Sequence, residues 1–156
     1  MRISVKCSSA IHILLMIAVL SSTNKITSEY LAASVGSNPV DIRRLLSSLK
    51  KAGLIHIPRG TGGATLTKEP KEITLLDIYS AVDSTSLNEL IGIHTHTEPR
   101  CLFGRNINRL LAGPYTRIGD AVREEMSSVT LEDLLVQLQE LEPEETIIKK
   151  DKTEKN

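Results

Sequence analysis

The chain has 156 residues, 40% of them hydrophobic and 3% aromatic, with 19 basic and 19 acidic side chains. This length allows one domain, or a small domain with an added dimerisation element, around a core that must be aliphatic. The two cysteines exclude a disulfide framework and form no CxxC pair, which favours a reducing, cytoplasmic location.

The neutral total conceals a difference between the two parts of the chain. Residues 1–66 hold eight lysines and arginines and two acids, whereas the rest holds 11 basic and 17 acidic residues. A basic half on a neutral protein is typical of a surface that binds a polyanion, although chance clustering on a solvated face gives the same count.

The apolar residues 11–20 predict a buried first helix, which we expect to begin near Val5. Arg2 and Lys6 before this run imitate a signal peptide, but His12 interrupts it and a poor cleavage site follows. The run is also shorter than the roughly 20 residues that span a bilayer. We therefore expect no membrane partner.

Two capping sequences predict two consecutive helices after a polar turn. Thr27 or Ser28 is suited to cap a short helix over residues 29–35, and Asn38 a longer one over residues 39–52. A glycine follows each helix, as is common at helix C-termini.

A two-stranded hairpin is predicted next, with strands over residues 54–57 and 64–67 and a glycine-rich tip over residues 58–63. The order helix, helix, turn, helix, hairpin is that of the winged helix-turn-helix. The sequence therefore predicts a mainly α protein with a small β-hairpin wing, a winged helix-turn-helix extended by a long dimerisation helix.

The second half of the chain is predicted to be helical. Its longest periodic stretch, residues 103–126, is interrupted by Gly113-Pro114, so one kinked helix and two separate helices both remain open. Shorter helices are expected over residues 74–82 and 131–141. Their expected caps are Thr74 and Thr130.

Four segments follow from these elements. They are a winged helix-turn-helix DNA-binding domain (1–83), a sensor or linker loop (84–102), dimerisation helices (103–141) and a disordered charged tail (142–156).

The candidate DNA-binding residues are polar, basic or small residues on the predicted helix starts, the third helix and the wing. They are Thr27, Ser28, Asn38, Val40, Asp41, Arg43, Arg44, Ser47, Lys50, Lys51, Arg59, Gly60, Thr61 and Gly62.

The third helix is the expected recognition helix, because its polar face suits a major groove about 12 Å wide. Arg43 and Arg44 are candidates for bidentate contacts to guanine. Lys50 and Lys51 suit phosphates, and Arg59 suits the backbone or an adjacent minor groove. Any one of these features alone also fits an ordinary solvated helix or turn; their order and spacing favour DNA binding.

Residues 1–141 resemble the Rrf2 family of bacterial transcription regulators. The resemblance is carried by AIHIL (10–14), NPVDIRRLLSSLKKAGLI (38–55), RGTGGA (59–64) and ITLLDIYSAVD (73–83). It implies a homodimer whose long helices cross onto the partner, and regulation of transcription through paired half-sites on double-stranded DNA.

Some members of that family hold an iron–sulfur cluster through three cysteines in the loop before the dimerisation helix. This chain has only Cys101 there, so we expect no cofactor and place the chain with the cluster-free, YwnA-like branch. We expect Cys101 to lie at a helix start near Arg100 and Arg105, where helix dipole and cations favour the thiolate of a redox sensor. Simple packing of this cysteine is the equal alternative.

Two further interpretations remain open. His94, His96 and Cys101 form a weak candidate metal site without an obvious fourth ligand. The winged helix also serves in some proteins as a protein-interaction module without DNA binding. We find no catalytic constellation and expect no enzyme activity.

The sequence therefore predicts a sequence-specific DNA-binding transcriptional regulator, expected to be a homodimeric repressor, with an oxidant or small molecule as candidate effector.

Overall fold

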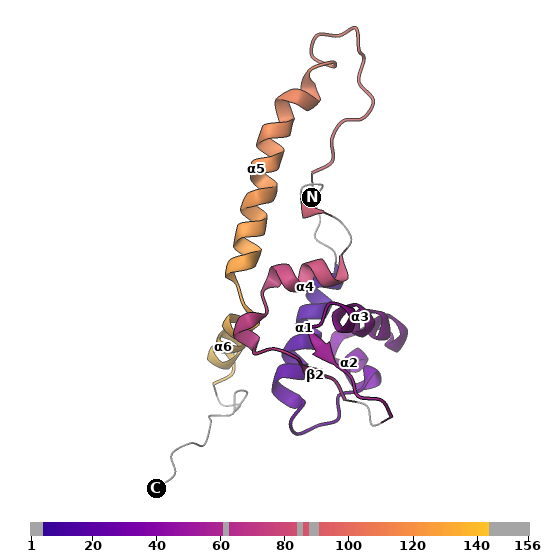
Figure 1. Ribbon diagram of the computed structural model, residues 1–156, viewed down its shortest axis with the longest axis vertical. Helices are drawn as coiled ribbons and strands as arrows, with labels where there is room; N and C mark the ends of the chain where they lie inside the picture. The colour runs from indigo at the N-terminus through magenta and orange to yellow at the C-terminus, as the bar shows by residue number, and fades with distance from the viewer. Residues whose placement is uncertain (1–4, 61–62, 84–85, 88–90, 144–156) are drawn as a thin grey trace.

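The structure is a computed structural model that describes residues 5–60, 63–83, 86–87 and 91–143. Its elements are α1 (Val5–Leu20), α2 (Ser28–Val35), α3 (Pro39–Lys51), β1 (Ile55–His56), β2 (Thr65–Leu66), the 3₁₀ turn η1 (Pro70–Glu72), α4 (Leu75–Val82), α5 (Ile107–Ser128) and α6 (Leu131–Leu141). Figure 1 shows one body built from α1 to α4, the hairpin and α6, with α5 projecting away from it.

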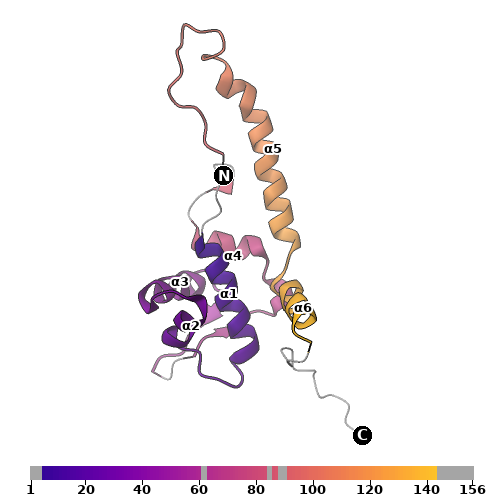
Figure 2. The same ribbon diagram turned by 180° about the vertical axis from the view of Figure 1, so that it is seen from behind.

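The first helix lies at the centre of the body. Ala10, Ile13, Leu14 and Ile17 on α1 are all fully buried. The helix contacts α2, α3, α4, α6 and β2, and from behind it separates α2 and α3 on one side from α6 on the other (Figure 2). This confirms the prediction of a buried first helix with the bounds that its apolar run indicated.

The helix-turn-helix forms through the predicted caps. The Thr27 hydroxyl accepts from the Tyr30 N–H at 3.2 Å, and the Asn38 side chain accepts from the Asp41 N–H at 2.9 Å. Gly36, at φ 69°, ends α2 in the left-handed conformation that an L side chain rarely adopts. The mainly α fold with a winged helix-turn-helix is thus confirmed.

The wing is a two-stranded antiparallel sheet in which Ile55 pairs with Leu66 and His56 with Thr65. Its strands are shorter than the predicted residues 54–57 and 64–67. Just beyond the sheet, the Thr67 N–H still donates to the Leu54 carbonyl at 3.2 Å.

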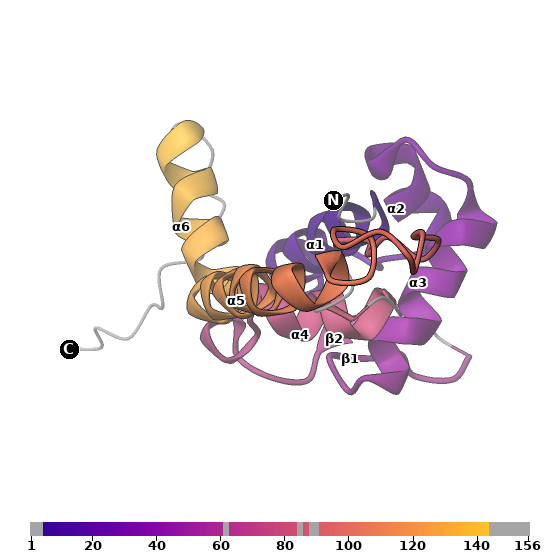
Figure 3. The same ribbon diagram turned by 90° about the horizontal axis from the view of Figure 1, so that it is seen from above.

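The long helix α5 is continuous through Pro114, so the helix is not divided there. It begins at Ile107 rather than at Phe103, because residues 101–106 close turns before the helix starts. Seen from above, α5 and α6 lie away from α3, at the other side of the body (Figure 3).

Candidate nucleic-acid interface

The third helix turns one face inward and leaves the opposite face to solvent. Its buried residues are Ile42, Leu45, Leu46 and Leu49. Successive residues of an α-helix are about 100° apart, so Val40, Ser47 and Lys51 lie along the middle of the exposed face. Arg44 also lies on this face, about 30° from its middle on the side of Asp41, whereas Arg43 lies about 70° from the middle, on the flank that faces α2.

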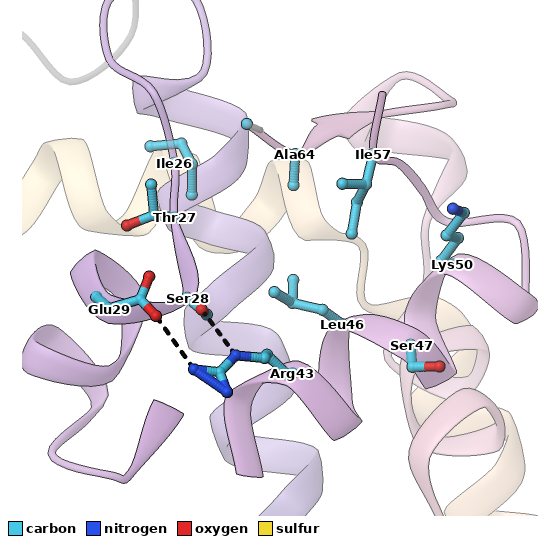
Figure 4. Close-up of a pocket in the computed structure, with 11 residues that line it drawn as sticks. Ile26, Thr27, Ser28, Glu29, Arg43, Leu46, Ser47, Lys50, Ile57 and Ala64 are labelled. Carbon is cyan, nitrogen blue, oxygen red and sulfur yellow. Dashed lines mark hydrogen bonds and ion pairs between the residues drawn. The ribbon is translucent and has the colours of Figure 1, made fainter. Parts of the chain in front are cut away.

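A hollow of about 420 Å³ lies beside α3, between the start of α2 and the wing (Figure 4). It brings together five of the predicted DNA-binding residues: Thr27, Ser28, Arg43, Ser47 and Lys50. Apolar side chains such as Leu46, Ile57 and Ala64 form its floor. Residues predicted separately at the start of α2 and on α3 therefore share one concave surface, which Ile57, Gly63 and Ala64 of the wing complete.

The side chain of Arg43 forms two hydrogen bonds with residues at the start of α2. Its Nε donates to the Ser28 hydroxyl at 3.3 Å, and its Nη2 contacts Glu29 Oε1 at 3.2 Å (Figure 4). Hydrogen bonds from the backbone N–H of Glu29 and from Ser28, with Arg43 beside the carboxylate, lower the pKa of Glu29. Glu29 is therefore charged at neutral pH and compensates the Arg43 charge.

Arg44 lies nearer the middle of the exposed face of α3 and lines a second hollow of about 380 Å³, together with Lys6 and Ser9 of α1. Its Nη1 contacts Asp41 Oδ1 at 3.4 Å, and its side chain is 78% exposed. Asp41 also accepts from Asn38 Nδ2 at 2.6 Å. Asn38 and Asp41 therefore support the start of α3.

Three cations complete the surface. Lys50, Lys51 and Arg59 are exposed, and none forms an ion pair with any residue that the structure describes. Arg59 precedes Gly60, whose φ of 82° requires the conformational freedom of glycine. The predicted residues Thr61 and Gly62 lie outside the described residues.

Sequence reasoning missed Lys25. It is exposed, and a Cβ atom on Gly63, which lines the first hollow, would stand 3.9 Å from its Cγ, so Lys25 lies beside the wing. Its only signal in the sequence is its membership of the basic half, because the contact with the wing spans 38 positions of the chain.

The comparisons with known proteins agree with this geometry. Residues 3–137 match the sequence model of Rrf2, described as an iron-dependent transcriptional regulator. The chain belongs to the Rrf2 family.

Among individual relatives, the Bacillus subtilis (strain 168) protein named "Putative HTH-type transcriptional regulator YwnA" is 37% identical over 85% of this chain and 96% of its own. A solved structure titled "a putative DNA binding protein" is 34% identical, covers 83% of this chain and 97% of that one, and has a TM-score of 0.65. CymR, the global cysteine regulator of B. subtilis, is 28% identical over 86% of this chain and 95% of its own, with a TM-score of 0.62.

As an Rrf2 protein, the chain is a DNA-binding transcription regulator and not an enzyme. The alternative of a winged-helix module that binds only proteins is set aside. The chain matches transcription regulators and a DNA-binding protein along most of its length. Within the described ranges, no helix combines the length and apolarity needed to cross a bilayer.

The residues of this Rrf2 chain do not fit an iron–sulfur cluster. Cys7 and Cys101 are its two cysteines. Cys7 is buried in the body in a cluster with Tyr79 and Leu87, and this burial raises the pKa of its thiol. Elsewhere in the described ranges, no three His, Cys, Asp or Glu side chains are grouped to hold a metal, so His94, His96 and Cys101 are not brought together.

Cys101 is exposed, but its predicted setting is wrong in one respect. It lies in a turn ahead of α5, which begins only at Ile107, so no helix start adjoins it. The pKa of its thiol is nevertheless lowered, because the backbone N–H groups of Gly104 and Phe103 stabilise the thiolate. The pKa is therefore lowered by backbone hydrogen bonds, and not by the helix dipole and the cations Arg100 and Arg105 that were expected from the sequence.

Proposed function

We propose that the protein is a homodimeric repressor that acts on double-stranded DNA in the cytoplasm. The observation that carries the dimer is an uncovered apolar stripe along α5. Val122 and Met126, near the end of the helix, pack with the body. The same face continues through Ile118, which is 41% exposed, and Leu111, which is half-buried.

A second copy of the chain suits this stripe. The helix has 22 residues and is therefore about 33 Å long, which far exceeds what the contact with α4 covers. Two copies crossing along α5 would bury both stripes by a two-fold operation. Their recognition helices would then address half-sites about one helical turn apart.

The dimer is tested by sedimentation of Ile118→Glu and Val136→Glu variants. Val136, on α6, is 46% exposed and so is a matched control outside the stripe. We expect Ile118→Glu to sediment as a monomer and Val136→Glu to remain dimeric. A monomeric wild type, or an Ile118→Glu variant that stays dimeric, would contradict the dimer along α5.

Repression is proposed because occupancy of promoter DNA is sufficient to exclude a polymerase. A reporter gene behind the protein's own upstream region should be expressed more strongly when the protein is absent. Lower expression in its absence would show activation instead.

We further propose Cys101 as an oxidant-sensitive thiol. The exposed thiolate would attack one oxygen of hydrogen peroxide, the O–O bond would break, and a sulfenic acid and hydroxide would result, the hydroxide taking a proton from solvent to form water. Residues 91–106 lie at the end of α5 remote from the wing (Figure 1), so the effect on DNA would pass through the dimer. Gel shifts before and after peroxide treatment test this: Cys101→Ser should abolish the response, whereas Cys7→Ser should retain it.

A further inference from the structure

The contacts of Arg43 divide its five N–H donors into two sets. In a guanidinium group, Nε and Nη2 share one edge, and Nη1 and Nη2 share the terminal edge. The first edge is occupied here, by Ser28 Oγ at 3.3 Å and Glu29 Oε1 at 3.2 Å. Nη1 makes no hydrogen bond with any described residue, so the terminal edge is available to a ligand.

We propose that Arg43, held by Ser28 and Glu29, is the residue that reads guanine, and that Arg44 does not. A guanine presents the O6 and N7 acceptors side by side in the major groove, and a terminal guanidinium edge matches them with two parallel hydrogen bonds. A fork whose other edge is already fixed loses less side-chain freedom when it binds.

Arg44 lacks this support. Its one ion pair, to Asp41 at 3.4 Å, comes from its own helix, and its side chain is 78% exposed against 57% for Arg43. It also lines a different hollow from the one between α2 and the wing. An exposed arginine of this kind suits a phosphate oxygen, which demands no particular orientation.

Glu29 adds selectivity to the contact. Its carboxylate lines the same hollow and compensates the Arg43 charge, so the pair attracts phosphates weakly. Arg43 therefore contributes little to binding that ignores sequence. Its contribution depends on the two acceptors of the correct base.

The test is selection from a pool of duplexes with a randomised 20-base-pair region, using the full-length protein and sequencing of the bound fraction. We expect wild type to enrich a guanine at a fixed position of the motif. Arg43→Ala should lose that preference by on the order of tenfold or more and keep the rest of the motif. Arg44→Ala, the adjacent matched control, should keep the guanine.

Ser28→Ala and Glu29→Ala test the positioning itself, because both leave Arg43 in place and both change exposed or half-exposed side chains. We expect each to weaken the preference at the same position and at no other. The Ser28→Ala and Glu29→Ala variants also test the proposal if circular dichroism shows that Arg43→Ala does not fold. An unchanged preference in both variants would overturn the positioning role.

The assignment to Arg43 would be overturned by a wild-type motif without guanine, by an Arg43→Ala motif that is intact, or by loss of the guanine in Arg44→Ala. The inference rests on DNA binding and not on the dimer. A selected motif that is a single half-site with guanine would support the Arg43 assignment and contradict the dimer. A selected motif that is an inverted repeat without guanine would support the dimer and contradict the Arg43 assignment.

Discussion

Thr74 and Thr130 lie opposite each other in an isolated antiparallel bridge, although 56 positions separate them in the chain. Backbone bonds flank the pair, from Leu75 N–H to the Val129 carbonyl at 3.0 Å and from Leu131 N–H to the Ile73 carbonyl at 2.8 Å. Each threonine also opens a helix through a capping box, with Asp77 and Asp133 respectively. The bridge thereby fixes α6 against the DNA-binding body.

Replacing Thr130 by alanine should lower the free energy of unfolding by about 1 kcal/mol, because the first turn of α6 loses its capping acceptor. Thr116→Ala is the matched control, since Thr116 lies within α5 and donates only to the Ala112 carbonyl of its own helix. Urea unfolding of both variants measures the difference. Equal effects would mean that the cap contributes nothing specific.

Two glycine substitutions should have opposite signs. Gly53→Ala should destabilise the protein by about 1 kcal/mol or more, because Gly53 has φ 75°. Gly113→Ala should stabilise it by about 0.5–1 kcal/mol, because Gly113 is helical and an added Cβ meets only the flexible end of Arg117 at 3.5 Å. Thermal melts should move in opposite directions. A loss of stability in Gly113→Ala would indicate that the added Cβ has no room, either beside Arg117 or against a second copy packed along α5.

The lowered pKa of Cys101 predicts a pH profile. Alkylation by iodoacetamide should rise with pH around a midpoint below that of an ordinary thiol, because the backbone N–H groups favour the charged form. Cys7 should react only after unfolding, since burial raises the pKa of its thiol.

Gly104→Ala should move the Cys101 midpoint upward. A Cβ at Gly104 would stand 2.6 Å from the Glu98 carbonyl oxygen, so the turn that supplies the donors must shift. Mass spectrometry of alkylated Cys101 against pH provides the measurement. A midpoint that is the same in Gly104→Ala and wild type would show that these donors do not set the pKa.

Lys51→Ala should weaken binding to all DNA sequences to a similar degree and reduce the slope of log K against log salt by about 1. The reason is that Lys51 is an exposed cation without an ion pair among the described residues, which suits a phosphate. Titrations on the selected motif and on random DNA, each at two salt concentrations, give both quantities. A loss confined to the selected motif would assign Lys51 to a base instead.

Much of the fold could be predicted because its signals are local. The bounds of α1, the cap Asn38 and the capping box at Thr130 each depend on residues within one or two turns of the chain. The same holds for the exposed polar face of α3, which follows from helical period alone. These features determined the winged helix-turn-helix, the basic surface and the family.

What only the tertiary structure decided are relations between distant residues. Sequence reasoning named both Arg43 and Arg44 as candidates for guanine contacts and placed Arg44 among the residues near the base edges, because only their positions on the helix could be compared. Packing of α2 against α3 places Ser28 and Glu29 beside Arg43, whereas Arg44 pairs with Asp41 of its own helix. Likewise, the donors to Cys101 come from a turn that no helical period indicates. Side-chain identity states which contacts are chemically possible, and only the path of the backbone determines which of them are made.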